Sequence, residues 1–328
     1  MGSHAQSLSR RFTTMPDDIM IQNGWMVGPW RKAINDFTPE TRPILRTLFK
    51  NQDNPLNIQI ETVNKQHITI HNDDVAKKVG MRGGVVAGIQ HLDLFSPIMV
   101  KAFGQNCFEK GSISLYYTYA LLEGEEVRAV VQVPPAGTMP VQVEVRAESP
   151  DGRIVAKGTL ALGNPDEKSY LQALEIESSP PEELRILKGV KAGDAMKPFE
   201  DMLDSLALEN WLVYLEDTIE WYSRKSPWGP PIAPLSRVIN FMQVPLPVIP
   251  QAVGFFGGTE IQFFNGPAKT DVPYRAKGKI IAVGVTSKTE YYWFESRLFE
   301  KKTDKLVAGM RHMSRFMKAG SPLYPEIR

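Results

Sequence analysis

The sequence predicts an α+β fold built twice from one unit, in which a helix led by Gly or Pro is followed by a run of antiparallel strands. Three observations predict this fold: segments that recur in order in the two halves, a similar helix start in each half, and strand patterns after each helix. The recurring segments are Gly111–Tyr117 with Gly258–Phe264 and Val127–Ala129 with Tyr274–Ala276 at one constant offset, then Arg153–Ala156 with Lys305–Ala308 after a short insertion.

The helix of each unit is expected just after a stretch of small residues. Met81–Ile89 and Pro227–Leu235 both place Gly or Pro directly before an apolar helical pattern. We therefore expect central helices over 88–103 and 235–243. Prolines at 245, 247 and 250 stop the second helix.

The strands are expected from alternation and from turn residues. Val141, Val143 and Val145 alternate with polar residues, which is the period of two that a half-buried strand shows. Residues 290–299 are rich in aromatic side chains and also indicate a strand. Asp151–Gly152 is a hairpin turn signal, and 303–305 holds the matching place in the second half.

The chain of 328 residues is long enough for two domains. We expect an N-terminal extension over 1–55, partly helical near 43–49, because its prolines leave no clean periodicity. The first unit then spans 56–163 and the second 206–320. The connector between them, 164–205, carries turn formers and charge, so we expect it to cross the surface and to hold a short helix at most.

Composition excludes several classes of protein. Lys+Arg 38 against Asp+Glu 37 leaves a net charge of +1, without the basic excess of a nucleic-acid binder. The single cysteine, Cys107, cannot form an intramolecular disulfide or a Cys-rich zinc site. No apolar run reaches the length of a membrane span, and the N-terminus lacks the apolar core of a secretory signal. A cytoplasmic protein with no membrane contact is the expectation.

A helix followed by a curved antiparallel sheet, present twice, is the arrangement of a double hotdog protein. Asp74–Gly88 resembles the stretch of MaoC-like hydratases in which an Ala-containing helix leads through a Gly-rich turn to the central helix. Trp221–Pro234 resembles the same stretch in the degenerate half of two-domain members, and Tyr274–Lys279 is similar to the strand that leads out of the sheet. The resemblance covers roughly 56–162 and 206–318.

This resemblance implies chemistry on an acyl thioester linked to coenzyme A or to a carrier. Active members hydrate a 2-enoyl thioester or dehydrate the 3-hydroxy form, so the thioester belongs to the substrate and no metal or further cofactor is expected. They use an Asp and a His in a Gly-Asp-x-Asn-Pro-x-His pattern. Neither half contains that pattern, and Ile70 fills the position of the family's His. The usual pair of catalytic residues cannot be transferred to this chain.

Substrate binding is expected at the start of the first central helix. Backbone N–H groups there can donate to the thioester oxygen, helped by the helix dipole. Prolines 230, 231 and 234 have no N–H, which makes the first half the better site. The alternative is that the glycines only permit a tight turn and close helix packing. The expected binding residues are Gly83, Gly84, Val86, Ala87 and Gly88.

An acid or base is expected near the same helix start. His67 and His71 alternate with isoleucines, which places both rings on one face of an extended run, and Asp73 follows. The alternative is an exposed edge strand, with Asn72 and Asp73 capping a helix at Val75. His91, on the central helix, can point into an acyl tunnel or can be a packing residue.

Acidic residues of the second half are further candidates. Glu216 and Glu220 are spaced to share a helix face beside Trp221 and Tyr222, and Asp217 lies between them. A carboxyl group near aromatic rings can have a raised pKa and act as an acid. The alternative is that these acids form the outer face of an amphipathic helix.

The sequence therefore leaves three functions open. The first is a hydratase or dehydratase, a lyase whose thioester carbonyl is polarised by the central helix. The second is a thioesterase of the same fold, and the third is an acyl-binding partner subunit without catalysis. Because open sheet edges favour association, we also expect a homodimer.

Overall fold

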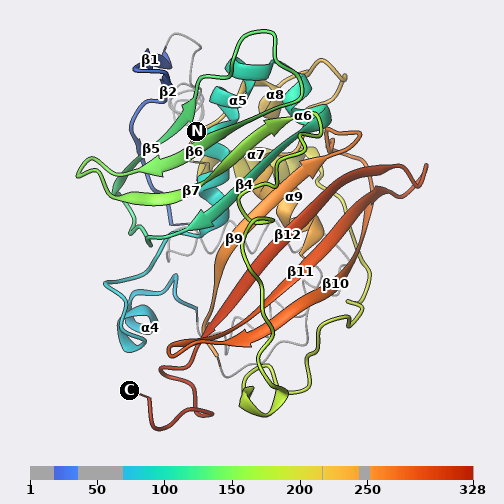
Figure 1. Ribbon diagram of the computed structural model, residues 1–328. Helices are drawn as coiled ribbons and strands as arrows, with labels where there is room; N and C mark the ends of the chain where they lie inside the picture. The colour runs from blue at the N-terminus through green and yellow to red at the C-terminus, as the bar shows by residue number, and fades with distance from the viewer. Residues whose placement is uncertain (1–17, 36–68, 216, 244–251, 328) are drawn as a thin grey trace.

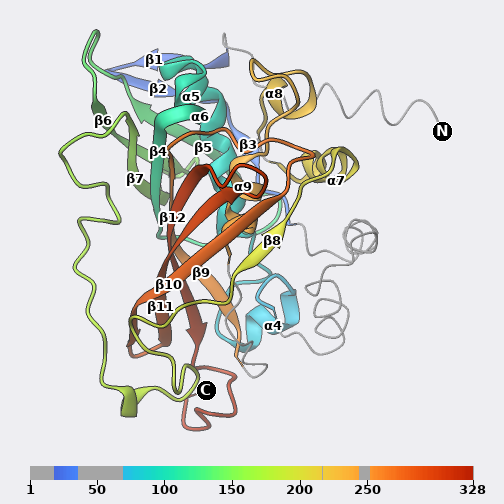
Figure 2. The ribbon, with the colours of Figure 1, turned by 90° about the vertical axis from the view of Figure 1, so that its right-hand side faces the viewer.

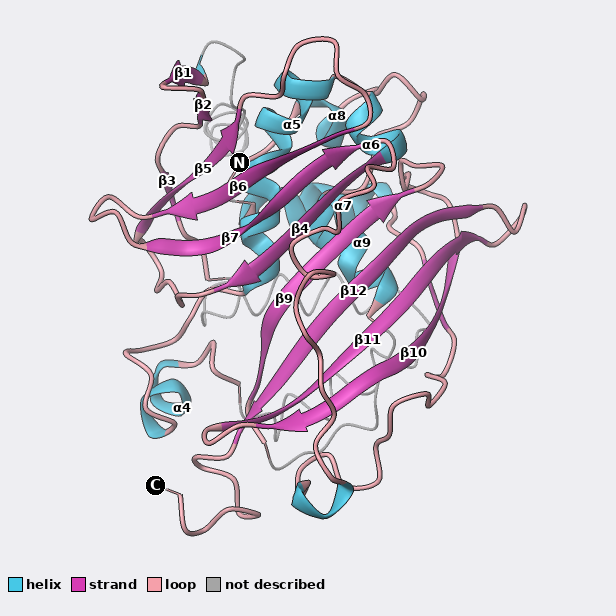
Figure 3. Ribbon diagram, in the orientation of Figure 1, coloured by secondary structure: helices cyan, strands magenta, loops and turns pink. Residues whose placement is uncertain are grey.

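The computed structural model describes residues 18–35, 69–215, 217–243 and 252–327. They form a 12-stranded sheet in the order β1-β2-β5-β6-β7-β4-β9-β12-β11-β10-β8, with β3 pairing β5 beside this path (Figure 1). Helices cover one face, and the connector crosses the other (Figures 2 and 3).

Each half contributes four antiparallel strands to this sheet. The predicted strands and hairpins are present, with Val141, Val143 and Val145 buried and Gly152 and Asp304 in left-handed turn conformations. The strands of the first half are β4 (Gly111–Tyr117), β5 (Glu126–Gln132), β6 (Val141–Glu148) and β7 (Ile154–Leu162). Those of the second half are β9 (Gly254–Phe263), β10 (Tyr274–Val285), β11 (Thr289–Glu300) and β12 (Leu306–Met317).

The two halves are joined by one strand pair, β4 with β9. Their antiparallel register runs from Ser112 opposite Gln262 to Tyr116 opposite Gly258. Beyond that point the strands separate. The Thr118 and Tyr119 N–H groups donate to the Val155 carbonyl of β7, while Gly254–Phe256 pairs with β12. The predicted continuous sheet is confirmed, and it opens at this end of the junction.

The central helices lie where the sequence predicts them. The first begins as a 3-10 helix, η2 (Gly88–Phe95), and continues as α5 (Ser96–Phe103), followed by α6 (Asn106–Lys110). Pro97 lies in the first turn of α5. A proline is tolerated there because the N–H groups of the first turn have no acceptor within the helix. The second central helix is α9 (Leu235–Met242), which packs against η2.

A buried carboxylate ties the two central helices together. Asp93 of η2 accepts hydrogen bonds from the Leu235 N–H at 2.9 Å and the Ser236 N–H at 3.3 Å. These are the first amides of α9, which have no partner within their own helix. The Asp93 side chain of one half therefore caps the helix of the other half.

The segments outside the two units join the sheet more closely than predicted. The N-terminal extension, for which the sequence predicts no strand, contains β1 (Met20–Gln22), β2 (Trp25–Val27) and β3 (Arg31–Lys32), and the last two pair with β5. Short strands of this kind carry too few residues for a periodic signal. The connector contains η3 (Pro181–Glu183) and β8 (Phe199–Asp201), which pairs with β10. The helix expected near 43–49 lies outside the described residues.

The segment before α9 departs from the expected amphipathic helix. It forms α7 (Ser205–Trp211), η4 (Leu212–Tyr214) and α8 (Glu220–Ser223), with extended backbone at Leu215 and Ile219. Residues 217–219 are not helical, so Glu220 opens a separate short helix, and Glu216 lies outside the described residues. Across the described ranges, no helix is both long and apolar enough to cross a membrane.

Replacement of Asp93 tests the link between the halves. We expect Asp93→Ala to lower the free energy of unfolding by about 2–3 kcal/mol, because two buried amides of α9 lose a charged acceptor. Asp93→Asn keeps an acceptor oxygen and should cost less. Urea unfolding measures both, with exposed Asp166→Ala as the control. Equal stability of Asp93→Ala and the control would contradict the capping role.

The acid stability of the fold depends on a buried histidine of β12. His312 is fully buried between Phe256 and Phe294, and its Nδ1 lies 2.9 Å from the Thr259 hydroxyl. Burial lowers the pKa of His312 from 6.5 to about 3. The folded ring stays neutral while the unfolded ring takes up a proton below pH 6.5, so folding stability falls as the pH falls through this window.

The measurement compares unfolding free energies at pH 7 and pH 5. We expect wild type to lose about 1.4 kcal/mol more per pH unit below 6.5 than His312→Gln, whose side chain does not titrate. The comparison uses the slope, so it stands even if the variant is less stable at pH 7. The same slope in both proteins would show that His312 does not carry this dependence.

Candidate active site

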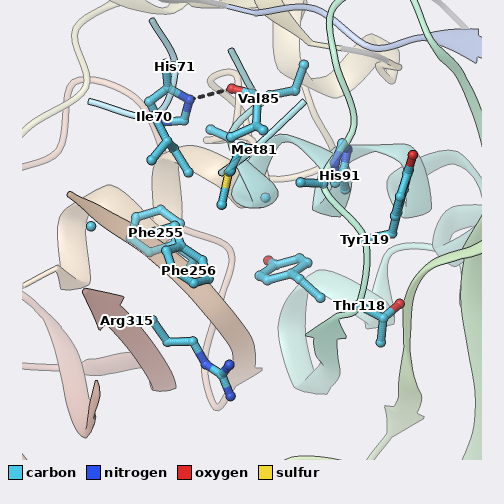
Figure 4. A pocket seen from close by; sticks show the side chains of 16 residues that line it. Ile70, His71, Met81, Val85, His91, Thr118, Tyr119, Phe255, Phe256 and Arg315 are labelled. Carbon is cyan, nitrogen blue, oxygen red and sulfur yellow. Dashed lines mark hydrogen bonds between the residues drawn. The ribbon is translucent and has the colours of Figure 1, made fainter. Parts of the chain in front are cut away.

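A pocket of about 300 Å³ lies where β4 and β9 separate, next to the start of η2 (Figure 4). Its walls come from both halves and are mainly apolar and aromatic. The lining comprises Ile70, His71, Met81, Val85, Val86, Ala87, Gly88, His91, Tyr117, Thr118, Tyr119, Ala120, Gly254, Phe255, Phe256 and Arg315.

His71 reaches the pocket from the loop before α4 (Asp73–Lys78). Its Nδ1 lies 2.6 Å from the Val85 carbonyl oxygen, which can only accept, so Nδ1 carries the hydrogen. In the neutral ring the lone pair is then on Nε2, the atom that can take up a proton. The Asn35 side-chain amide also donates to the His71 carbonyl at 2.9 Å and holds the backbone of this loop.

Gly84 allows this loop to pack closely against the turn before η2. A Cβ at Gly84 would lie 2.6 Å from the His71 carbonyl oxygen, a distance that no side chain tolerates. The Gly84 N–H donates to an Asp73 oxygen at 3.0 Å, and the Val86 N–H donates to the Leu121 carbonyl at 2.8 Å. Both amides are committed to protein acceptors, and Gly83 and Gly84 are not among the lining residues, so the close-packing alternative describes these glycines better.

The amides at the start of η2 have a different environment. Ala87 is the N-cap and Gly88 the first residue of the helix, and both line the pocket. Among the described residues, the N–H groups of Gly88 and Ile89 donate no hydrogen bond to a carbonyl outside the helix. A Cβ at Gly88 would meet the Tyr117 ring at 3.2 Å, so this glycine keeps the pocket open beside the ring. Of the predicted binding residues, Val86, Ala87 and Gly88 thus line the pocket.

His91 brings a second imidazole to the pocket from η2. The residue is buried, with 2% of its surface exposed, and it lines the pocket between Met81 and Tyr119 (Figure 4). Tyr117 contributes an aromatic wall, and burial raises the pKa of its hydroxyl far above the usual range, with a smaller opposing effect from Thr259.

Three predicted carboxylates lie outside the pocket lining. Asp73 is exposed and bonded to Lys77 and to the Gly84 N–H, and these partners hold its pKa below the usual range. Asp217 is buried 3.4 Å from Arg31, where it links β3 to the second half. Glu220 is exposed, 3.9 Å from Arg224. The pocket therefore brings His71 and His91 together without any of these three carboxylates. His67 and Glu216 lie outside the described residues.

Several lining residues carry no clear signal in the sequence. Tyr117 and Tyr119 belong to the aromatic strand residues, but periodicity does not say which of those face a cavity. Phe255 and Phe256 lie in the Gly-rich run 254–258, which matches no phosphate loop. Arg315 reaches the pocket only through the register of β12 with β9, which no local pattern encodes. No cluster of three metal-ligating side chains occurs among the described residues.

Comparisons with known proteins give a match in structure only. No family model matches the chain, and no curated protein matches it in sequence. A Chloroflexus aurantiacus MaoC domain protein, named as a dehydratase, superposes with a TM-score of 0.56 at 8% identity, covering 93% of this chain and 97% of that one. A Mycobacterium tuberculosis protein described as a double hotdog gives 0.55 at 12% identity, covering 93% and 98%.

The fold is a double hotdog. Both matches extend over nearly the whole of each chain, and the two units joined through β4 and β9 supply the same architecture. At these identities the likeness establishes the fold, and the site has to be argued from its own residues.

Two glycine variants separate the roles of Gly84 and Gly88. Gly84→Ala places its Cβ against a fixed backbone oxygen, and we expect a loss of about 2 kcal/mol in unfolding free energy together with displacement of His71. Gly88→Ala meets a ring that can move, so it should cost less stability. Thermal and urea unfolding measure the difference. A Gly84→Ala protein at least as stable as Gly88→Ala would contradict the packing described for this loop.

Proposed function

We propose that this protein is a hydratase or dehydratase acting on an acyl thioester. The observation that carries the proposal is the pocket itself, in which amides at a helix start and two histidines converge within apolar walls. Such a combination of a mainly apolar cavity, hydrogen-bond donors and titratable groups is typical of an active site. The structural match to a MaoC domain protein supports the same reaction class.

The thioester carbonyl is placed against the N–H groups of Gly88 and Ile89. These donors stabilise negative charge on the carbonyl oxygen as it develops, and the dipole of η2 adds to them. The apolar side chains around them exclude water and strengthen this interaction. The aromatic walls formed by Tyr117, Phe255 and Phe256 then enclose the acyl chain.

Hydration needs one group that removes a proton from water and one that supplies a proton to the α-carbon. His71 Nε2 takes a proton from the attacking water, and the water oxygen bonds to the β-carbon. The electron pair of the carbon–carbon double bond then moves through the α-carbon onto the thioester oxygen. The resulting enolate collapses when the α-carbon takes up the proton held on His71, which returns His71 to its neutral form. Dehydration is the same sequence in reverse.

Asp73 has a positioning role in this scheme. Its carboxylate bonds the Gly84 N–H and so fixes the turn that carries Val85, whose carbonyl sets the tautomer of His71. The thioesterase alternative expects a carboxylate that activates water, and the described lining of the pocket has none. Assembly as a homodimer stays a prediction, to be measured by light scattering.

The reaction is tested with a panel of enoyl-CoA and saturated acyl-CoA esters. We expect loss of the conjugated enoyl absorbance without release of free thiol. His71→Ala should lower kcat by at least about a hundredfold, the usual contribution of a positioned base, with the fold unchanged by circular dichroism. Exposed Glu220→Gln is the control and should keep full activity.

The same panel separates the alternatives. Thiol release without water addition would replace the lyase with a thioesterase. Full activity of His71→Ala would remove this histidine from the chemistry, and His91→Ala would then be the next variant to measure.

A further inference from the structure

Arg315 is a permanently charged residue in a pocket that is otherwise mostly apolar. It lies on β12, opposite Tyr291 on one side and Phe255 on the other. Its guanidinium Nη2 donates to the Tyr116 hydroxyl at 3.1 Å, and Nε lies 3.4 Å from the Met313 sulfur. Figure 4 shows Arg315 across the pocket from His71, with Phe255 and Phe256 between them.

Other partly buried arginines of the sheet have a carboxylate partner. Arg128 and Arg146 both contact Glu148, at 2.6 and 2.8 Å, and Arg311 contacts Glu295 at 2.6 Å. Arg315, on the same strand as Arg311, makes no ion pair with any described residue. A half-buried guanidinium without a counter-charge is unfavourable. An anionic ligand at this position would supply the missing charge.

The backbone of β9 makes room for this guanidinium. Gly258 faces Met313 and Phe256 faces Ser314, so Gly257 is the extra residue of a bulge. A Cβ at Gly257 would clash with the Met313 sulfur and would lie 3.1 Å from Arg315 Nε. Gly257 therefore leaves room for both side chains.

A second cation without an ion pair among the described residues, Lys157, lies outside the pocket. Lys157 of β7 lies opposite Tyr116 in the sheet, is exposed, and has its Nζ 5.7 Å from the Tyr170 ring. The rings of Tyr116 and Tyr170 are 6.4 Å apart. Lys157 also has no ion pair within the described chain. Arg315 therefore contacts the Tyr116 hydroxyl, and Lys157 lies opposite Tyr116 on the neighbouring strand.

We propose that Arg315, with Lys157 beyond it, is the anion subsite of this pocket and binds an oxyanion carried by the thioester substrate. The forked guanidinium suits two oxygens of one carboxylate or phosphate. The oxyanion comes either from a carboxylate at the end of the acyl chain or from a phosphate of coenzyme A. The identity of the ligand as a thioester rests on the proposed function. The binding of an oxyanion by Arg315 does not depend on the reaction that the protein catalyses.

The test measures the binding of three esters by calorimetry: pentanoyl-CoA, glutaryl-CoA and S-pentanoyl-pantetheine. Arg315→Gln should lower the affinity for the ester that carries the recognised oxyanion about ten- to hundredfold, which is the usual contribution of a charged hydrogen bond. Arg315→Lys should lower this affinity less. Arg311→Gln, on the same strand but outside the pocket, is the matched control and should bind all three as wild type does.

The pattern of losses identifies the source of the oxyanion. A loss confined to glutaryl-CoA assigns the acyl carboxylate, and an equal loss for both CoA esters, with S-pentanoyl-pantetheine unaffected, assigns the phosphate. Unchanged binding of all three esters by Arg315→Gln overturns the subsite.

A separate arm covers failure of the proposed function. If wild type binds none of the esters, thermal unfolding with glutarate or inorganic phosphate tests the subsite alone. Stabilisation of wild type and Arg311→Gln, lost in Arg315→Gln, supports the anion subsite even without thioester binding. The same response of all three proteins to both anions overturns it.

Discussion

The pairing of β4 with β9 is the constraint on which the rest of this structure depends. It converts two half-sheets into one and sets the two central helices against each other on a single face. Because the pairing ends at Tyr116 and Gly258, the two strands part at the start of η2. The pocket, its aromatic walls and the position of Arg315 all follow from where this strand pair stops.

Polar contacts within the apolar interior then fix the details of the site. Asp93 satisfies the first amides of α9, and so holds the helix of one half against that of the other. Asp73 and the Val85 carbonyl fix the glycine turn and the His71 ring. Gly88, at the start of η2, lines the pocket, and this is why we propose the amides there as donors to a thioester oxygen.

The sequence predicts the fold well and the site in part. The duplicated segments, the two central helices and the hairpins at Gly152 and Asp304 could be predicted because local patterns encode them. His71, His91 and Gly88 could be proposed from their place near one helix start. The carboxylates could not be ranked, because periodicity does not reveal the contact of Asp73 with Gly84 across a turn or that of Asp217 with Arg31 from a distant part of the chain. Arg315 depends on strand register and on a bulge, which periodicity does not reveal.

The central claim is that a thioester binds with its carbonyl at the start of η2. A crystal structure with a saturated acyl-CoA, which cannot be hydrated, tests this most directly. The account predicts the thioester oxygen within about 3 Å of the Gly88 and Ile89 nitrogens, and the acyl β-carbon facing His71 or His91. A thioester bound elsewhere on the protein, with the pocket beside Gly88 empty, would contradict it.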